Sequence, residues 1–215
     1  MNIIRKPFRY NYTSVVFYLI GINVLVYFAQ HIFWNIGPYN ISLTDYLAMR
    51  PGLVLRGWVW QLVSYMFVHA PRSWTHILFN MLGLFIFGVQ VERRMGSREF
   101  LLYYFITGTL AGVISFAAYY ITDTPAILLG ASGAVFAVEL AFATFFPDAI
   151  IYIWGIIPLR APVMVLGFTA LELFFSVSGM QSNVAHLTHL SGFAVGWLYF
   201  LVRFRTNPWR AFRGR

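Results

Sequence analysis

Long apolar runs dominate the pattern of hydrophobic and polar positions along this chain. A membrane-spanning helix needs about 20 mostly apolar residues, and six runs approach that length. They cover residues 14–30, 75–91, 99–122, 126–146, 161–177 and 184–202. A further apolar stretch at 149–159 is too short to span a bilayer alone. The pattern predicts an all-α polytopic membrane protein with six transmembrane helices in one domain, residues 1–215.

Composition supports a membrane protein over the other classes. Of the 215 residues, 60% are hydrophobic and only 10% are charged, whereas a soluble domain carries about 25% charged residues. The chain contains no cysteine, which excludes disulfides, thiolate catalysis and cysteine-type zinc sites. The first apolar run is not followed by a small-residue cleavage site, so we expect a retained anchor rather than a removed signal peptide.

The basic residues predict the orientation, because short cytoplasmic loops collect Lys and Arg. Twelve of the 15 fall on one side of the predicted helices: Arg5, Lys6, Arg9, Arg93, Arg94, Arg98, Arg160, Arg203, Arg205, Arg210, Arg213 and Arg215. Only Arg50, Arg56 and Arg72 fall on the other. Both termini are therefore expected in the cytoplasm. Topology alone explains the net charge of +8, without a nucleic-acid partner. A short chain without sorting signals fits a bacterial inner membrane.

The connection at 31–74 is long and unusually rich in tryptophan. It carries Trp34, Trp58, Trp60 and Trp74, with apolar residues between them. Tryptophan is enriched at the headgroup level of bilayers, so we expect an interfacial loop of short amphipathic helices. A structural anchor is the favoured role, although such a loop can also face an incoming substrate.

Polar residues within the predicted helices are the candidate functional groups, because polar groups at membrane depth are costly. His76 and Asn80 are four residues apart, and His186 and His189 are three apart, so each pair shares a helix face. Ser132 lies in the run Gly130-Ala131-Ser132-Gly133. In the predicted topology all three sites lie toward the outer side. Each has an ordinary alternative: small-residue packing for the serine and interhelical hydrogen bonding for the histidines. Together they supply what acyl transfer needs.

Small residues next to these polar groups predict close helix packing. Gly133 and Ala137 follow Ser132, and Gly192 and Gly196 follow His189. Such pairs let helices approach closely, as a Ser–His hydrogen bond of about 2.6–3.2 Å requires. Glu139 lies seven residues beyond Ser132, about 10 Å along a helix and too far to assist. Glu172 cannot be placed from the sequence, and His186 is expected to bond to a loop or to water.

Three runs together resemble the rhomboid intramembrane serine proteases. They are His76-Ile77-Leu78-Phe79-Asn80, Gly130-Ala131-Ser132-Gly133, and His189-Leu190-Ser191-Gly192 with Gly196. The resemblance implies that Ser132 is the nucleophile and His189 the general base. It also implies an oxyanion hole made by His76, Asn80 and the Ser132 backbone N–H. Substrates would be transmembrane proteins within the lipid bilayer, cleaved with no cofactor and no metal.

Two positions depart from the family pattern. Phe136 stands where tyrosine is common, and its ring is expected to support the His189 imidazole without offering a hydroxyl. The first loop has Trp60-Gln61 where some members have Trp-Arg, which removes a charged loop anchor. Neither change removes a catalytic group.

Three other functions fit the sequence less well. A catalytically silent, client-binding relative is disfavoured because Ser132 and His189 are both retained. A transporter or channel is disfavoured because the polar groups cluster at one depth and no inverted repeat is evident. A metal site of His76, His186 and His189 has no carboxylate near it in the sequence, and chelator-resistant activity would exclude it.

Overall fold

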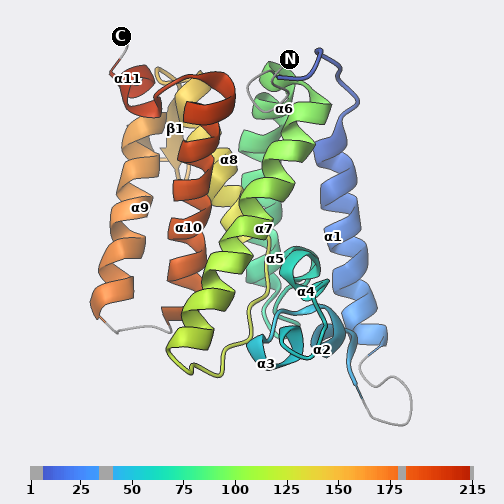
Figure 1. Ribbon diagram of the computed structural model, residues 1–215. Coiled ribbons are helices and arrows are strands. Elements are labelled where there is room, and N and C mark those ends of the chain that lie inside the picture. Colours follow the sequence, from blue (N-terminus) through green and yellow to red (C-terminus); the bar gives the residue numbers. More distant parts are fainter. Residues whose placement is uncertain (1–6, 34–40, 179–182, 214–215) are drawn as a thin grey trace.

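Six helical rods stand side by side in the structure, a computed structural model that describes residues 7–33, 41–178 and 183–213, with side chains from His186 in the last segment (Figure 1). Four rods are single helices: α1 (Val15–Ile32), α7 (Ser97–Ile121), α8 (Ser132–Phe145) and α9 (Ala161–Ser178). A fifth rod consists of α5 (Trp74–Gly83), the π-helical turn η3 (Leu84–Gly88) and α6 (Val89–Met95). The sixth consists of α10 (Asn183–Tyr199) and the π-helical turn η4 (Phe200–Phe204). A short helix α11 (Pro208–Phe212) follows.

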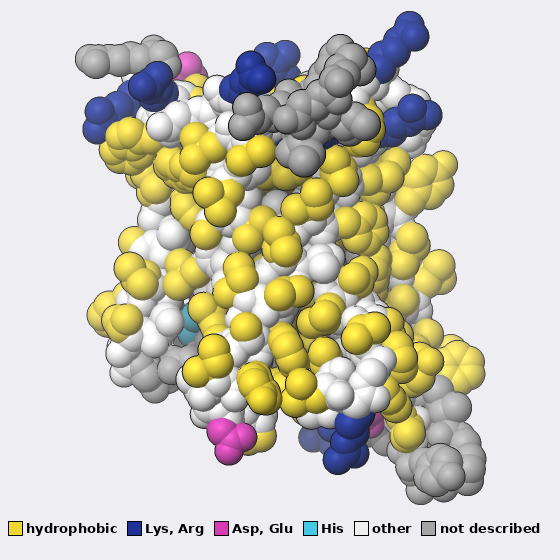
Figure 2. Space-filling model, in the orientation of Figure 1, with side chains coloured by type: hydrophobic (Ala, Val, Ile, Leu, Met, Phe, Trp, Pro, Cys, Tyr) yellow, Lys and Arg dark blue, Asp and Glu magenta, His cyan; other side chains and the backbone are white. Residues whose placement is uncertain are grey.

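The predicted fold class, a polytopic helical membrane protein, is confirmed. Among the described residues, five helices are long and apolar enough to cross a membrane, and α8 is a shorter apolar helix. Hydrophobic side chains cover the middle of the face shown in Figure 2, while arginine side chains gather toward the two ends. This distribution is typical of an integral membrane protein.

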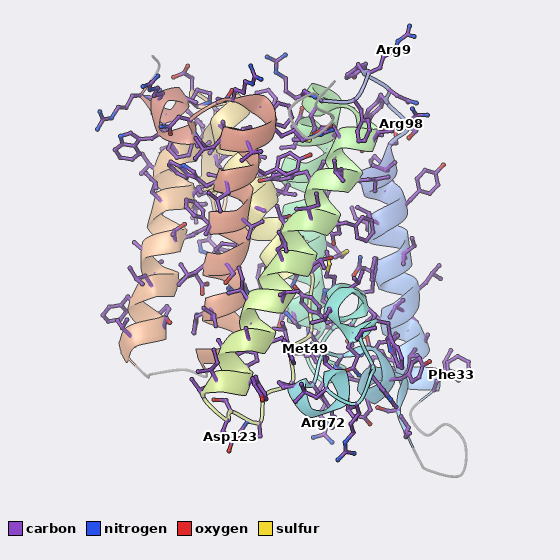
Figure 3. All side chains as sticks on the ribbon, viewed as in Figure 1. Arg9, Phe33, Met49, Arg72, Arg98 and Asp123 are labelled. Carbon is purple, nitrogen blue, oxygen red and sulfur yellow. The ribbon has the colours of Figure 1, made fainter. Side chains whose placement is uncertain are left out.

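The two ends of the bundle differ in what they carry. Arg9 and Arg98 lie at one end, called here the terminal end, where the first described residues and α11 also lie (Figures 1 and 3). Arg72 and Asp123 lie at the opposite end, where the short helices of the first loop gather, called here the loop end (Figure 3). The helices therefore separate Arg9 and Arg98 from Arg72, as the sequence predicts.

The fourth transmembrane helix begins later than predicted. Residues 126–146 are apolar, yet α8 starts only at Ser132. The preceding chain is held in an extended form, because Leu128 and Met49 exchange two backbone hydrogen bonds of 2.9 Å each. Gly130 then adopts φ +116°, which an L side chain rarely adopts. The hydropathy pattern contains no sign of the Leu128–Met49 pairing or of the Gly130 conformation. Together these two features place Ser132 at a helix N-terminus.

The short apolar stretch after α8 forms an antiparallel hairpin. Its strands are β1 (Ile150–Ile153) and β2 (Ile157–Arg160), paired from Ile150 with Arg160 to Ile153 with Ile157. The Trp154 ring at the turn meets the Phe79 ring of α5, with centroids 6.1 Å apart. The hairpin therefore joins α8 to α9 and contacts α5.

The first loop contains the short helices predicted for it. They are α2 (Leu43–Leu47), α3 (Pro51–Val54), α4 (Gln61–Ser64) and the 3₁₀ turn η2 (Tyr65–Phe67). Gln61 is fully buried; it accepts from the Arg50 backbone N–H at 3.1 Å and donates to the Asp45 carbonyl at 3.1 Å. The neutral Gln61 amide thus bridges two parts of the loop through hydrogen bonds. Trp34, predicted as part of this anchor, lies outside the described residues.

Two buried carboxylates fasten the terminal end. Glu92 accepts from the backbone N–H groups of Val15 at 2.8 Å and Val16 at 3.0 Å, and so caps α1. Glu99 accepts from the Phe8 backbone N–H at 3.0 Å and from the Tyr199 hydroxyl at 2.5 Å, and it pairs with Arg203. These bonds tie the N-terminal segment and the end of α10 to the middle of the chain.

Candidate active site

The Ser132 and His189 side chains meet between α8 and α10. Ser132 Oγ lies 2.7 Å from His189 Nε2, within the range for a nucleophile and its base. The approach depends on two glycines, because a Cβ on Gly192 would lie 1.9 Å from the Gly133 carbonyl oxygen. The two backbones are thus in direct contact beside the pair. Gly196, one turn further, faces Tyr103 of α7 and Ala137 of α8.

Phe136 supports the imidazole of His189. The two rings are stacked, with centroids 4.5 Å apart and planes 7° apart. Phe136 lies four residues after Ser132 and therefore on the same face of α8. The aromatic surface fixes the plane of the imidazole and keeps Nε2 directed at the serine.

His76, in the first turn of α5, presents a ring nitrogen beside the serine. The Ala70 backbone N–H donates to His76 Nδ1 at 3.2 Å, so in the neutral ring the proton is on Nε2. A Cβ on Gly130 would lie 2.8 Å from His76 Nε2 and 3.8 Å from Ser132 Oγ. The bare backbone at Gly130 therefore leaves room for an N–H donor next to the nucleophile.

His69, in the loop before α5, is a second buried imidazole behind His76. The ring centroids of His69 and His76 are 5.2 Å apart. Burial, and secondarily the neighbouring His76, lowers the pKa of His69 to about 3. His69 is therefore neutral at physiological pH and packs against His76 without adding charge to the site.

Asn80 lies one turn after His76 and, like His76, lines the cavity beside Ser132 that is described below. Its side-chain N–H donates to the His76 carbonyl oxygen at 2.8 Å, within α5. Its Oδ1 is buried and has no hydrogen-bond partner. The amide is thus engaged by its own helix, whereas His76 Nε2 faces Gly130 directly.

The start of α8 supplies backbone donors. The first N–H groups of a helix have no intrahelical acceptor, and the helix dipole is positive at this end. Because α8 begins at Ser132, the serine N–H is one of these groups. The structure therefore brings the Ser132 backbone, Ser132 Oγ and His76 together at one point.

Glu172 reaches the pair from α9, which sequence reasoning missed. Its Oε2 lies 2.6 Å from His186 Nδ1 and 3.1 Å from His189 Nδ1. His186 therefore bonds to this carboxylate, and the expectation that it would bond to a loop or to water is wrong. Glu172 lies 40 residues beyond Ser132 in the sequence, and no motif connects them. The one available signal was a carboxylate within an apolar helix.

The same three side chains are the set that could hold a metal ion in the described part of the chain. One ligand atom each from Glu172, His186 and His189 lies within 4.8 Å of the others. This set differs from the histidine trio considered from the sequence, because Glu172 replaces His76. In the structure the ring nitrogens of His189 already face Ser132 and Glu172.

A cavity of about 1050 Å³ adjoins the pair. It is bounded by α5 with η3, by α8 and α9, and by the β1–β2 hairpin. Its polar lining includes His76, Asn80, Ser132, Glu139, Glu172 and His189. Most of the remaining lining is apolar, with Phe79, Ile86, Phe168 and Phe175 among it. The site therefore combines an apolar chamber with a serine, a base and donors at one wall.

Comparison with known proteins gives a consistent family. The family model for the rhomboid domain matches residues 56–206. The rhomboid protease AarA of Providencia stuartii is 27% identical over 197 residues, covering 84% of this chain and 69% of that protein. The rhomboid protease GlpG of Haemophilus influenzae is 32% identical over 151 residues, covering 69% of this chain and 73% of that protein.

The relatives also include a plant protein. Rhomboid-like protein 11, chloroplastic, of Arabidopsis thaliana is 28% identical over 205 residues, covering 89% of this chain and 65% of the relative. The matched region contains Ser132, His189, His76 and Asn80. Helical architecture, motifs and relatives agree, and the chain belongs to the rhomboid family.

Proposed function

We propose that this chain is an intramembrane serine endopeptidase that cleaves transmembrane segments of other membrane proteins. The observation that carries the proposal is the 2.7 Å contact between Ser132 Oγ and His189 Nε2 at the wall of a large cavity. Proteases among the relatives support the same reaction class. A silent client-binding protein would need neither this contact nor donors beside the serine.

The proposed mechanism follows the placement of the groups. His189 Nε2 takes the proton from Ser132 Oγ as the oxygen attacks the substrate carbonyl, and later gives it to the departing amine. His76 Nε2–H and the Ser132 backbone N–H stabilise the oxyanion of the tetrahedral intermediate. A water molecule, activated by the same base, then hydrolyses the acyl-enzyme. Asn80 assists as a further donor.

The proposed substrate is a membrane-spanning helix that partly unwinds. Amides in a helix are hydrogen-bonded and shielded, so attack requires local unwinding at the cut site. Small or helix-weakening residues there would lower its cost. The cavity reaches α9 through Phe168, Leu171 and Phe175, and we propose sideways entry past this helix. The polar and small residues at 178–183 predict a flexible loop beside this helix. Residues 179–182 of that loop lie outside the described residues.

We propose that both termini face the cytoplasm and that the membrane is a bacterial inner membrane. The separation of Arg9 and Arg98 from Arg72 at opposite ends supports the orientation (Figure 3). A reporter fused after Arg215 should read as cytoplasmic, whereas a reporter in the Arg56–Trp60 loop should read as exported. An exported signal from the fusion after Arg215 would contradict this topology.

A serine-directed fluorophosphonate probe tests the nucleophile without knowledge of the substrate. The purified wild type should be labelled, and Ser132→Ala should not be. Ser191→Ala is the matched control, because it removes a buried serine of α10 that is not assigned to the reaction; it should be labelled. Absence of labelling in folded wild type would favour the silent, client-binding alternative.

A further inference from the structure

We propose that Glu172 is a positioning residue that completes a Ser132–His189–Glu172 triad, with His186 holding the carboxylate in place. This inference rests on the proposed function. The sequence motifs assign no role to Glu172, and the sequence alone suggests a dyad supported by Phe136 only.

Ser132 and Glu172 face the two different nitrogens of the His189 imidazole ring. His189 Nε2 faces Ser132 Oγ at 2.7 Å, and Nδ1 faces Glu172 Oε2 at 3.1 Å. Nδ1 is buried and makes no well-directed hydrogen bond in this arrangement, so the carboxylate is the acceptor within reach. Proton placement on Nδ1 follows, which leaves Nε2 free to accept the serine proton.

His186 explains why the carboxylate stays at this position. Its Nδ1 lies 2.6 Å from the same Oε2 atom, and the His186 ring is itself packed against Phe175 of α9, with centroids 5.7 Å apart. The Nδ1 atoms of both imidazoles therefore lie within 3.1 Å of one carboxylate oxygen. His186 and Glu172 are 8% and 17% exposed in their side chains, so little solvent competes for these contacts.

The triad has a clear physical role during attack. When His189 accepts the serine proton it becomes an imidazolium, and a nearby carboxylate stabilises the new positive charge. Glu172 itself remains ionised, and its proton count does not change. The stabilisation is larger where few waters screen it. Because the 3.1 Å contact is poorly directed and the carboxylate is shared with His186, the effect should be smaller than in soluble triads.

The test compares Glu172→Gln with wild type in the purified full chain, using a model transmembrane substrate. The amide can present N–H to Nδ1, which favours the wrong tautomer; the corresponding change in a soluble triad lowers kcat about 10⁴-fold. We expect kcat to fall about 100-fold here, with KM changed less than about twofold. Glu172→Asp, which keeps the charge but shortens the side chain, should recover part of kcat.

The pH profile of kcat/KM separates positioning from packing. Removing a negative charge next to His189 makes its protonated form less favourable, so the acid limb should move to lower pH in Glu172→Gln. The other titratable groups around the site are His186 on α10, His76 on α5 and Glu139 on α8. Asp148→Asn is the matched control, because it removes a carboxylate that is 85% exposed and lies outside the cavity; its acid limb should stay in place.

The outcomes are decisive in both directions. Wild-type kcat and an unmoved acid limb in folded Glu172→Gln would overturn the triad, while loss of cleavage in Ser132→Ala would leave the proposed function intact. If Glu172→Gln does not fold, Glu172→Asp decides, and unchanged kcat there would overturn the proposal. Loss of wild-type activity with a chelator, restored by zinc, would instead assign Glu172, His186 and His189 to a metal and contradict the triad.

Discussion

Carboxylates occur fully buried at the terminal end and partly buried at the active site, and their partners differ. At the terminal end, Glu92 and Glu99 accept from backbone N–H groups of the N-terminal segment, and Glu99 also pairs with Arg203. At the active site, Glu172 faces two imidazoles beside a cavity. Backbone N–H groups are neutral and keep their proton, whereas an imidazole can gain or lose one.

Three of the eight unpaired buried side-chain polar atoms among the described residues lie at the active site. In the described part of the chain, Asn80 Oδ1, Glu139 Oε2 and His189 Nδ1 are buried without hydrogen-bond partners, and all three residues line the cavity. An unpaired buried polar atom costs about 1–3 kcal/mol. The terminal end therefore contributes stability, while the active site retains atoms whose bonding can change when a substrate enters.

The largest expected effect is the loss of the base. His189→Ala should lower kcat by about 10⁵-fold or more, since loss of a base in a comparable site costs about 10⁶-fold. The double variant with Ser132→Ala should be little worse than either single variant, because the two side chains act as one unit. His186→Ala should retain substantial cleavage. Cleavage rates of the purified proteins give the comparison, and a base at His186 would reverse the pattern.

The terminal end should respond in stability and not in chemistry. Glu99→Gln removes one partner of a buried ion pair, which typically costs about 3–5 kcal/mol of unfolding free energy. Thermal unfolding in detergent should show a lower midpoint, while kcat per folded molecule stays at the wild-type value. Asp148→Asn is the matched control, because it breaks an ion pair whose carboxylate is 85% exposed; its midpoint should change little. A catalytic defect without destabilisation in Glu99→Gln would break the comparison.

His76→Ala should show the opposite response to Glu99→Gln. Removing an oxyanion donor costs about 2.7–4 kcal/mol in the transition state, so kcat should fall about 10²–10³-fold with a modest change in thermal midpoint. His31→Ala is the control, since that exposed histidine bonds to the Tyr27 and Pro71 carbonyls away from the serine. A wild-type rate in His76→Ala would remove this residue from the oxyanion hole.

Asn80→Ala should have the smallest effect of the series. Its amide donates to the His76 carbonyl in the structure, so only part of its donor capacity is available to the oxyanion. We expect kcat to fall about tenfold, equivalent to about 1.4 kcal/mol. Steady-state kinetics beside His76→Ala ranks the two donors. A loss in Asn80→Ala that exceeds the loss in His76→Ala would contradict the assignment made from the structure.

The sequence predicts what depends on local pattern. Apolar runs predict the helices, the charge asymmetry predicts the separation of Arg9 from Arg72, and short motifs bring Ser132 and His189 forward as candidates. Other features depend on contacts between distant segments. The start of α8 is set by pairing of Leu128 with Met49, and Glu172 reaches His189 only through helix packing. The β1–β2 hairpin could not be predicted either, because the periodicity of a short apolar run does not distinguish a strand from a helix.

The central claim is that Ser132 is the nucleophile of an intramembrane protease. The most direct measurement incubates purified wild type and Ser132→Ala with the same model transmembrane substrate and follows the two fragments over time. The account predicts cleavage by wild type and none by Ser132→Ala, with equal thermal unfolding midpoints for the two proteins. Fragments produced by Ser132→Ala at a rate near that of wild type would contradict it.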